Sequence, residues 1–275
     1  MIKYYSIKHK SFGQLARYET SLNKCSGNIL NISAEFLRPY CVAYLDQLFL
    51  KTNIKSKLLL KSKHSTANRY LQQCGFKYLH PSAEFSKPFP QEFIAPIKRF
   101  SGSLDMDDQY VNWVKSMIIK HMPKVNNKLE KKIIESLWEI IQNSLGHSES
   151  KYGVTACGQY YPEKKYFEIA FVDCGYGISA KVGKFLNKKL DDSDFIEWAM
   201  KEGNSTLNKE AAGLGLHIFR QFIKLNSGAF QIVSGNGYFG NMESTQDEKF
   251  TIKNFLPGTV VNIRINFDDN TYILK

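Results

Sequence analysis

The stretch ESLWEIIQNSLGHS, residues 135–148, decides how the C-terminal half of the chain is interpreted. It places polar side chains at intervals of four, at Glu135, Glu139, Asn143 and His147. Because an α-helix advances by about one turn in four residues, these side chains follow a single, slowly turning stripe. Apolar side chains fill the opposite arc, which is typical of an ordinary amphipathic helix with a solvated polar face. Only motifs elsewhere in the chain can favour the alternative, a stripe that faces a ligand.

The composition is that of a globular protein. The 275 residues are 43% hydrophobic and 23% charged, and the length suggests about two domains. No apolar run approaches the roughly 18 residues that cross a bilayer, and the N-terminus MIKYYSIKHK lacks the apolar segment of a secretion signal. The five cysteines have no metal-ligand spacing and fit a reducing compartment, so we expect a cytoplasmic protein without a membrane partner. They are Cys25, Cys41, Cys74, Cys157 and Cys174.

The net charge of +11 is compatible with several partners. Nucleic acid, a membrane surface or an acidic ligand such as a nucleotide would each be attracted to it. The lysines are spread along the whole chain, so the charge alone does not choose among these partners.

A cluster of prolines divides the chain near residue 90. Four of the eight prolines fall there, at Pro81, Pro88, Pro90 and Pro96, and predict an extended connector. Before it, strands are predicted at 28–33 and 55–62, and each precedes a predicted helix, at 41–53 and 65–76. This β-α-β-α order implies an α/β domain with parallel neighbouring strands.

After the connector, the pattern predicts helices at 107–122 and 127–145 and a hairpin of strands at 153–161 and 165–173. A helical piece follows near 184–202, then a helix at 213–225. Three strands close the chain, at 229–235, 249–255 and 259–267.

Two glycine-containing motifs carry candidate chemistry. Asp173 ends a predicted strand, and Gly175 and Gly177 let the backbone turn sharply beside a ligand. Gly175-x-Gly177-x-x-Ala180 also matches the dinucleotide fingerprint, but the acids about 20 residues on lie in FLNKKLDDSDFIEW, which has helical or loop character. We reject that match because the acid should end a second parallel strand. A plain turn remains the simple alternative for these glycines.

The second motif is AAGLGLHIF, residues 211–219, in which Gly213 and Gly215 precede an apolar helix. The free backbone N–H groups of such a helix start attract phosphate. It is not a Walker loop, because no GK[ST] follows. Flexible capping of a buried helix would explain the motif equally well when it is taken alone.

Taken together, three segments resemble the N, G1 and G2 boxes of the GHKL ATPases. They are Glu139-x-x-x-Asn143, Asp173-x-Gly175-x-Gly177 and Gly213-Leu214-Gly215-Leu216. The superfamily includes gyrase, the heat-shock chaperone ATPases, sensor kinases and the mismatch-repair ATPases. The order of the boxes matches, and so does the wide gap before the third box, which the family fills with a mobile lid, here 181–212. Pro257-Gly258-Thr259 resembles the family's terminal Gly-Thr element, so the resemblance covers about residues 105–267.

The resemblance implies an ATP site with Mg²⁺ in a Bergerat-type α/β sandwich, a mixed sheet with helices on one face. Asn143 would then hold Mg²⁺, Glu139 would activate water as the general base, and Asp173 would accept a hydrogen bond from the adenine amino group. Gly175 and Gly177 would shape the pocket with Thr259 nearby, while Gly213 to Leu216 would wrap the phosphates. Glu135 and His147 would extend the polar stripe or support these groups.

Residues 1–90 resemble STAS domains, the fold of anti-sigma antagonists. The place where that family carries a phosphorylatable Ser or Thr reads LRPYCVAYL, with Pro39, Tyr40 and Cys41, so phosphorylation of this domain stays open. A small α/β docking module is the alternative. The expected organisation is therefore a STAS-like domain at 1–90, a connector at 91–104 and a GHKL-type ATP-binding domain at 105–275. We expect a protein partner for the first domain, and homodimerisation stays open.

Three functions follow. The first is an ATP-hydrolysing switch in signalling or prokaryotic defence. The second is a protein serine kinase of the anti-sigma type; the sensor-kinase form is disfavoured because His121 lies close to the ATP-site helix and no separate dimerisation hairpin is predicted. The third is a non-catalytic module that binds a nucleotide or, with weaker support, nucleic acid.

Overall fold

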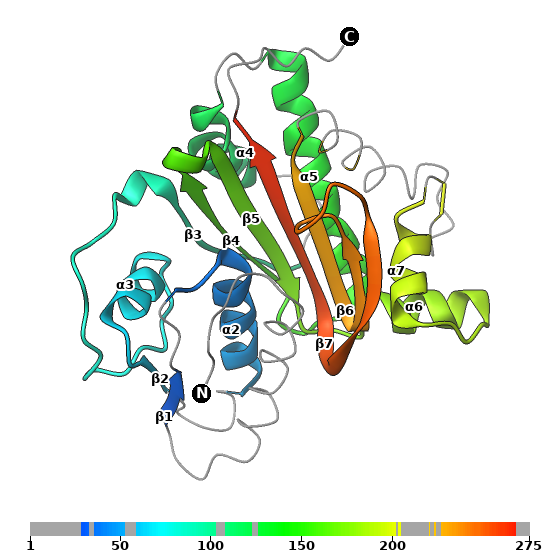
Figure 1. The fold of residues 1–275 in the computed structure, drawn as a ribbon, viewed down its shortest axis with the longest axis horizontal. Helices are drawn as coiled ribbons and strands as arrows, with labels where there is room; N and C mark the ends of the chain where they lie inside the picture. The colour runs from blue at the N-terminus through cyan, green and yellow to red at the C-terminus, as the bar shows by residue number, and fades with distance from the viewer. Residues whose placement is uncertain are drawn as a thin grey trace.

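The computed structural model is shown in Figure 1. It describes residues 29–32, 36–52, 59–102, 108–122, 126–201, 203–204, 220, 223 and 227–267, without the side chains of residues 29, 147 and 148.

A five-stranded sheet organises the C-terminal part. Its strands lie in the order β3 (Ile94–Phe100), β4 (Val154–Tyr161), β5 (Tyr166–Asp173), β7 (Glu248–Asn266) and β6 (Ala229–Gly240). Every pairing in it is antiparallel, so the expected mixed sheet is wrong. The short link η3 (Pro162–Lys164) between β4 and β5 forms the predicted hairpin, and a link that short can join only antiparallel strands.

One face of the sheet is covered by α4 (Asp108–Met117) and α5 (Asn127–Ser148), with η2 (Ile119–His121) between them. Phe167, Ile169 and Phe171 point to this face from alternate positions of β5 and belong to one apolar core with residues of α5 such as Leu137. The α5 helix begins where Asn126 caps it by accepting a hydrogen bond from the Leu129 N–H at 2.8 Å. The predicted amphipathic helix is therefore present, with its apolar arc on the sheet.

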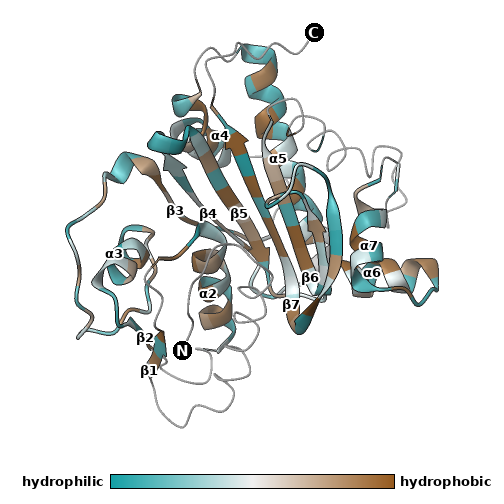
Figure 2. Cartoon of the chain, in the orientation of Figure 1, coloured by the Kyte–Doolittle hydropathy of each residue, from teal (hydrophilic) through white to brown (hydrophobic). Residues whose placement is uncertain are grey.

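The other face of the sheet is covered by α2 (Pro39–Thr52), which contacts β4, β5 and β7. The expectation of helices on one face concerned residues 105–275, and the helix on this second face comes from the N-terminal part of the chain. Each residue from Pro39 to Phe49 is buried, as a helix enclosed on all sides requires. The opposite positions of the strands, including Cys157, Ala170 and Val172, share its apolar core. Figure 2 shows the apolar residues along α2 and the central strands.

The α2 core continues into β1 (Ile29–Ile32), β2 (Leu59–Ser62) and α3 (Ser65–Gln73). β1 and β2 pair in parallel, so the predicted β-α-β-α unit and its parallel strands are confirmed. One apolar cluster thus joins residues from both sides of residue 90, and the division into two domains stays a prediction.

Part of the stretch predicted as a connector forms the edge of the sheet. After η1 (Gln91–Phe93), β3 pairs with β4 on one side, and its register shifts between Ala95 and Lys98. Pro96 lies within that irregularity. A proline has no N–H to donate, which an edge strand with a bulge tolerates and a central strand does not.

The last two predicted strands are one strand, the 19-residue β7, which forms a long hairpin with β6. The hairpin bends where its register shifts near Gly235. Beyond the bend it folds back on the outer edge of β6: Asn241 N–H donates to the Phe230 carbonyl at 2.9 Å, and Phe230 N–H donates to Asn241 Oδ1 at 2.9 Å. The edge of β6 is therefore partly capped by its own hairpin.

Two buried carboxylates fix α2 against the sheet. Asp46, 0% exposed, accepts from Arg99 of β3 through both oxygens, at 2.8 and 2.6 Å, and from Thr155 Oγ1 at 3.0 Å. Just before the helix, Arg38 donates to the buried Glu168 of β5 at 2.8 Å. Such charges are tolerated only when they are paired, so they allow one orientation of the helix.

We expect Asp46→Ala to lower the free energy of unfolding by roughly 3 kcal/mol, because it leaves the Arg99 guanidinium without its buried partner. Urea unfolding followed by circular dichroism measures the change. Lys131→Ala is the control, because its pair with Glu135 at 3.8 Å is exposed and its removal should cost no more than about 0.5 kcal/mol. Equal effects of the two substitutions would contradict the role of Asp46.

Candidate functional site

Asp173 lies at the end of β5 and is 1% exposed. Its Oδ1 accepts a hydrogen bond from the Gly175 N–H at 3.0 Å, and the carboxylate also accepts from the backbone N–H of Thr259 and the hydroxyl of Ser144. Burial raises the pKa of Asp173 to about 7, against the three hydrogen bonds, which lower it. A carboxyl group that titrates near neutral pH at a strand end is a candidate functional group.

Two glycines let the backbone close around Asp173. Gly177 opens α6 (Gly177–Leu186) with φ +80°, and a Cβ there would stand 2.5 Å from Ser234 Oγ. Gly258 has φ +82°, and a Cβ there would stand 2.0 Å from the Asp173 carbonyl oxygen. Neither position admits a side chain, so the second glycine of Asp-x-Gly-x-Gly and the glycine of Gly-Thr are required by the backbone.

The structure thus brings together four of the predicted site residues. Thr259 of β7 is the Cα partner of Asp173 in the sheet, and Gly175 and Gly177 follow Asp173 directly. Segments about 85 residues apart in the chain therefore meet at one end of the sheet. Because this meeting depends on sheet register, it is independent of the sequence motif that suggested it.

The predicted catalytic and metal-binding residues lie on α5. Glu139 and Asn143 are each half-buried on this helix, and Ser144, the next residue, contacts Asp173. Helix α5 therefore approaches the end of β5 close to Asn143. Glu135, one turn before Glu139, pairs with Lys131 at an exposed position. The His147 side chain and the predicted phosphate-binding residues Gly213, Leu214, Gly215 and Leu216 lie outside the described residues.

Two serines of this site were not predicted. Ser144 directly follows the motif residue Asn143, and Ser234 ends the apolar run AFQIV before a glycine-rich turn. Ser234 Oγ accepts from the Ile178 N–H at 2.9 Å and donates to the Gly258 carbonyl at 2.8 Å. A polar residue between a buried strand and glycines was the available signal, the same that drew attention to Asp173.

The segment predicted as a lid, 181–212, is not a loop in its described part. It contains the end of α6 and α7 (Asp192–Ala199), whose Phe195 and Ile196 are buried. Asp192 Oδ2 accepts from the Asn236 N–H of β6 at 2.6 Å, which fixes the start of α7 on the sheet. These elements agree with the helical piece predicted near 184–202, and the role of the segment as a lid stays a prediction. Residues 205–212 lie outside the described residues.

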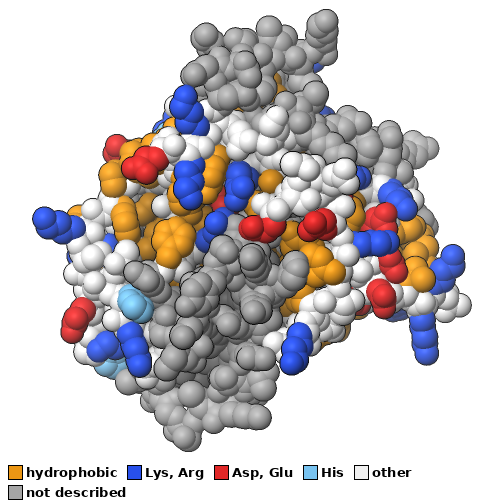
Figure 3. All heavy atoms as spheres, in the orientation of Figure 1, with side chains coloured by type: hydrophobic (Ala, Val, Ile, Leu, Met, Phe, Trp, Pro, Cys, Tyr) orange, Lys and Arg blue, Asp and Glu red, His pale blue; other side chains and the backbone are white. Residues whose placement is uncertain are grey.

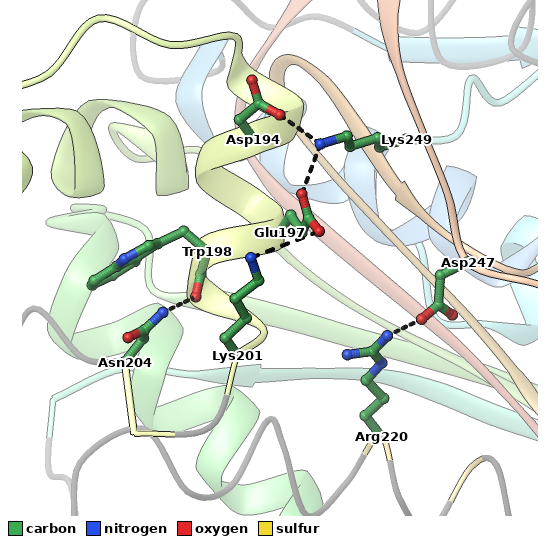
Figure 4. Close-up of polar contacts among 8 residues, drawn as sticks. All are labelled: Asp194, Glu197, Trp198, Lys201, Asn204, Arg220, Asp247 and Lys249. Carbon is green, nitrogen blue, oxygen red and sulfur yellow. Dashed lines mark hydrogen bonds and ion pairs between the residues drawn. The ribbon is translucent and has the colours of Figure 1, made fainter.

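Ion pairs attach α7 to the β6–β7 hairpin, as Figure 4 shows. Lys249 donates to Asp194 at 2.8 Å and to Glu197 at 2.7 Å. From the same hairpin, Asp247 pairs with Arg220, one of the helical residues beyond the predicted phosphate-binding glycines. The hairpin thus contacts the chain on both sides of that motif.

The visible surface in Figure 3 intersperses Lys and Arg with Asp, Glu and apolar side chains. Among the described residues visible on that face, the basic side chains do not form one continuous groove of the kind that tracks nucleic acid. In the part of the chain that the structure describes, no group of three or more His, Cys, Asp or Glu side chains could hold a metal ion. Nor does any helix there have the length and apolar character needed to cross a membrane.

The chain was compared with protein-family models and with curated proteins, and neither comparison gives a match.

Asp173 should make the stability of the protein depend on pH. Its folded pKa of about 7 lies above the ordinary value of 3.8, so between these values the folded state binds more protons than the unfolded state. The free energy of unfolding should therefore fall as the pH rises from about 4 to 7 and level off above 7. Asp173→Asn removes the titrating group. The difference in the free energy of unfolding between parent and variant, measured by urea unfolding from pH 4 to 8, should therefore change across that window. A difference that stays constant with pH would contradict the raised pKa of Asp173.

Proposed function

We propose that the protein binds ATP with Mg²⁺ beside Asp173 and hydrolyses it, as a regulatory ATPase of the GHKL type with a Bergerat-type C-terminal domain. The observation that supports the proposal best is the junction at the end of β5. There a buried carboxylate, two glycines without room for a side chain and the Gly-Thr element of β7 come together from distant segments. The GHKL resemblance requires these same groups around adenine.

The hydrogen-bonding capacity of Asp173 suits an adenine amino group. An ionised carboxylate offers about four acceptor sites, and Gly175, Thr259 and Ser144 use three of them. One acceptor site is left for a ligand donor. The 6-amino group of adenine supplies a donor, whereas the 6-carbonyl of guanine would place an acceptor against the carboxylate. The site should therefore prefer ATP to GTP.

The proposed roles of Glu139 and Asn143 follow from the position of α5 next to this junction. Asn143 offers an amide oxygen, a ligand type that Mg²⁺ accepts, so it would hold the ion, which would offset the negative charge of the phosphates. Glu139, one turn earlier, would orient and deprotonate the attacking water. In this proposal Gly213 to Leu216 bind the phosphates through backbone N–H groups.

Phosphoryl transfer to a protein serine is the alternative outcome of the same site. A histidine acceptor is disfavoured at His121, because its ring stacks on Tyr160 at 4.2 Å and its Nε2 contacts the Glu92 carbonyl at 3.1 Å. Incubation with labelled ATP and Mg²⁺ separates the two reactions, since hydrolysis releases free phosphate and a kinase labels protein.

The N-terminal part would serve as the regulatory module of this cytoplasmic protein. Its parallel β1 and β2 and the order of its helices support the STAS likeness. Tyr40 and Cys41 at the start of α2 are buried, which does not favour a phosphorylation switch there. We propose that the module binds a protein partner, and signalling or prokaryotic defence is the setting that fits a nucleotide-controlled switch.

Calorimetry should detect ATP binding that requires Mg²⁺, with GTP binding more weakly. Asp173→Asn should weaken ATP binding by roughly 10- to 150-fold, because a hydrogen bond to a charged group is worth about 1.5–3 kcal/mol. Asp191→Asn, at an exposed acid just before α7, is the matched control and should bind like the parent. Absence of ATP binding by folded parent protein would refute the proposal.

Measurements of turnover should distinguish the roles of Glu139 and Asn143 on α5. Glu139→Ala should lower the rate of phosphate release by about 10²–10⁴ while ATP affinity changes little, because a general base does not hold the ground-state phosphates. Asn143→Ala should weaken both binding and turnover, with partial recovery at high Mg²⁺. Glu135→Gln, one turn away, serves as the control with a milder defect. Full activity in Glu139→Ala would contradict the role of Glu139 and would favour the alternative, in which the polar side chains of α5 only face solvent.

A further inference from the structure

Ser234 connects three segments around Asp173. It is fully buried near the bend of β6, where it accepts from the Ile178 N–H in the first turn of α6 and donates to the Gly258 carbonyl of β7. Its oxygen also lies 3.4 Å from Thr259 Oγ1. The hydroxyl thus bridges the turn after β5 and the strand that pairs with β5, without contacting Asp173 itself.

The Gly258 carbonyl and the Thr259 N–H belong to one peptide group. Ser234 binds the oxygen of that group, and the N–H of the same group donates to the Asp173 carboxylate. A peptide group is planar and its resonance polarises both ends, so a hydrogen bond to the oxygen strengthens the N–H as a donor. The same bond also fixes the plane that aims the N–H at the carboxylate.

We propose that Ser234 is a positioning residue that acts through the Gly258–Thr259 peptide group to hold Asp173 ionised and correctly oriented for the adenine amino group. This inference rests on the proposed nucleotide site, but its first step concerns only the ligand-free protein. The Ser234 hydroxyl donates to the Gly258 carbonyl, which shares a peptide plane with the Thr259 N–H. That N–H in turn donates to the Asp173 carboxylate.

The first measurement needs no nucleotide. The carboxyl carbon of Asp173, followed by NMR from pH 5 to 9, should titrate about half a pH unit higher in Ser234→Ala, because the weakened Thr259 N–H stabilises the carboxylate less. Ser179→Ala is the matched control: it removes a hydroxyl from the same helix start, and the hydrogen bond of that hydroxyl to the Asp192 carbonyl is marginal at 3.5 Å. An unchanged midpoint in Ser234→Ala would overturn the inference.

The second measurement is ATP affinity across the same pH range. If binding needs the ionised carboxylate, Ser234→Ala should bind ATP about threefold more weakly than the parent at pH 6 and equally well at pH 9. A loss of the same size at every pH would indicate a purely structural role and overturn the inference. Should Ser234→Ala fail to fold, Ser234→Cys keeps a similar volume with a weaker donor and should shift in the same direction.

The two measurements distinguish failure of the proposed function from failure of the role of Ser234. A parent protein that binds no ATP refutes the proposed function and the inference about adenine together. A parent that binds ATP, combined with an unshifted Asp173 titration in the serine variants, refutes the role of Ser234 alone.

Discussion

The pairing of Asp46 with Arg99 and Thr155 is the constraint on which the arrangement of the molecule depends. A fully buried carboxylate is stable only with its partners in place, so α2 can neither rotate nor slide along the sheet without exposing a charge to an apolar environment. Its position in turn buries the second face of β4 and β5. Because helices pack on both faces, these strands keep a fixed register, and this register places Thr259 beside Asp173.

Local patterns predicted most of the helices and strands because each depends on spacing within a few residues. The parallel β1–β2 unit, the α5 helix and the β4–β5 hairpin are of this kind. The errors concern relations between distant segments. The strand FEIAFV, in which Glu168 interrupts an otherwise apolar run, already indicated cover on both faces, since a half-exposed strand alternates polar and apolar residues. Which element provides that cover, and which charge pairs with Glu168, cannot be read from spacing.

The same limit applies to the candidate site. Asp173, the glycines after it and Thr259 could be selected from motifs, and the structure places them together. Ser234 lies 56 residues beyond Ile178 and has no distinguishing neighbours except glycines, so its contact emerges only when β6, β7 and α6 meet. The helical piece predicted near 184–202 contains α7, whereas the role of this segment as a lid cannot be read from its helical pattern.

The two edges of the sheet have a consequence for assembly. On one side, the returning hairpin occupies main-chain groups of β6 at Phe230. On the other, Pro96 removes a donor from β3, and the Ile97 N–H is taken by the Cys74 carbonyl at 2.8 Å. Neither border offers an incoming chain an uninterrupted row of donors and acceptors, so a foreign β-segment has no template to extend. Association at either of these two edges would therefore have to use side chains rather than an added strand.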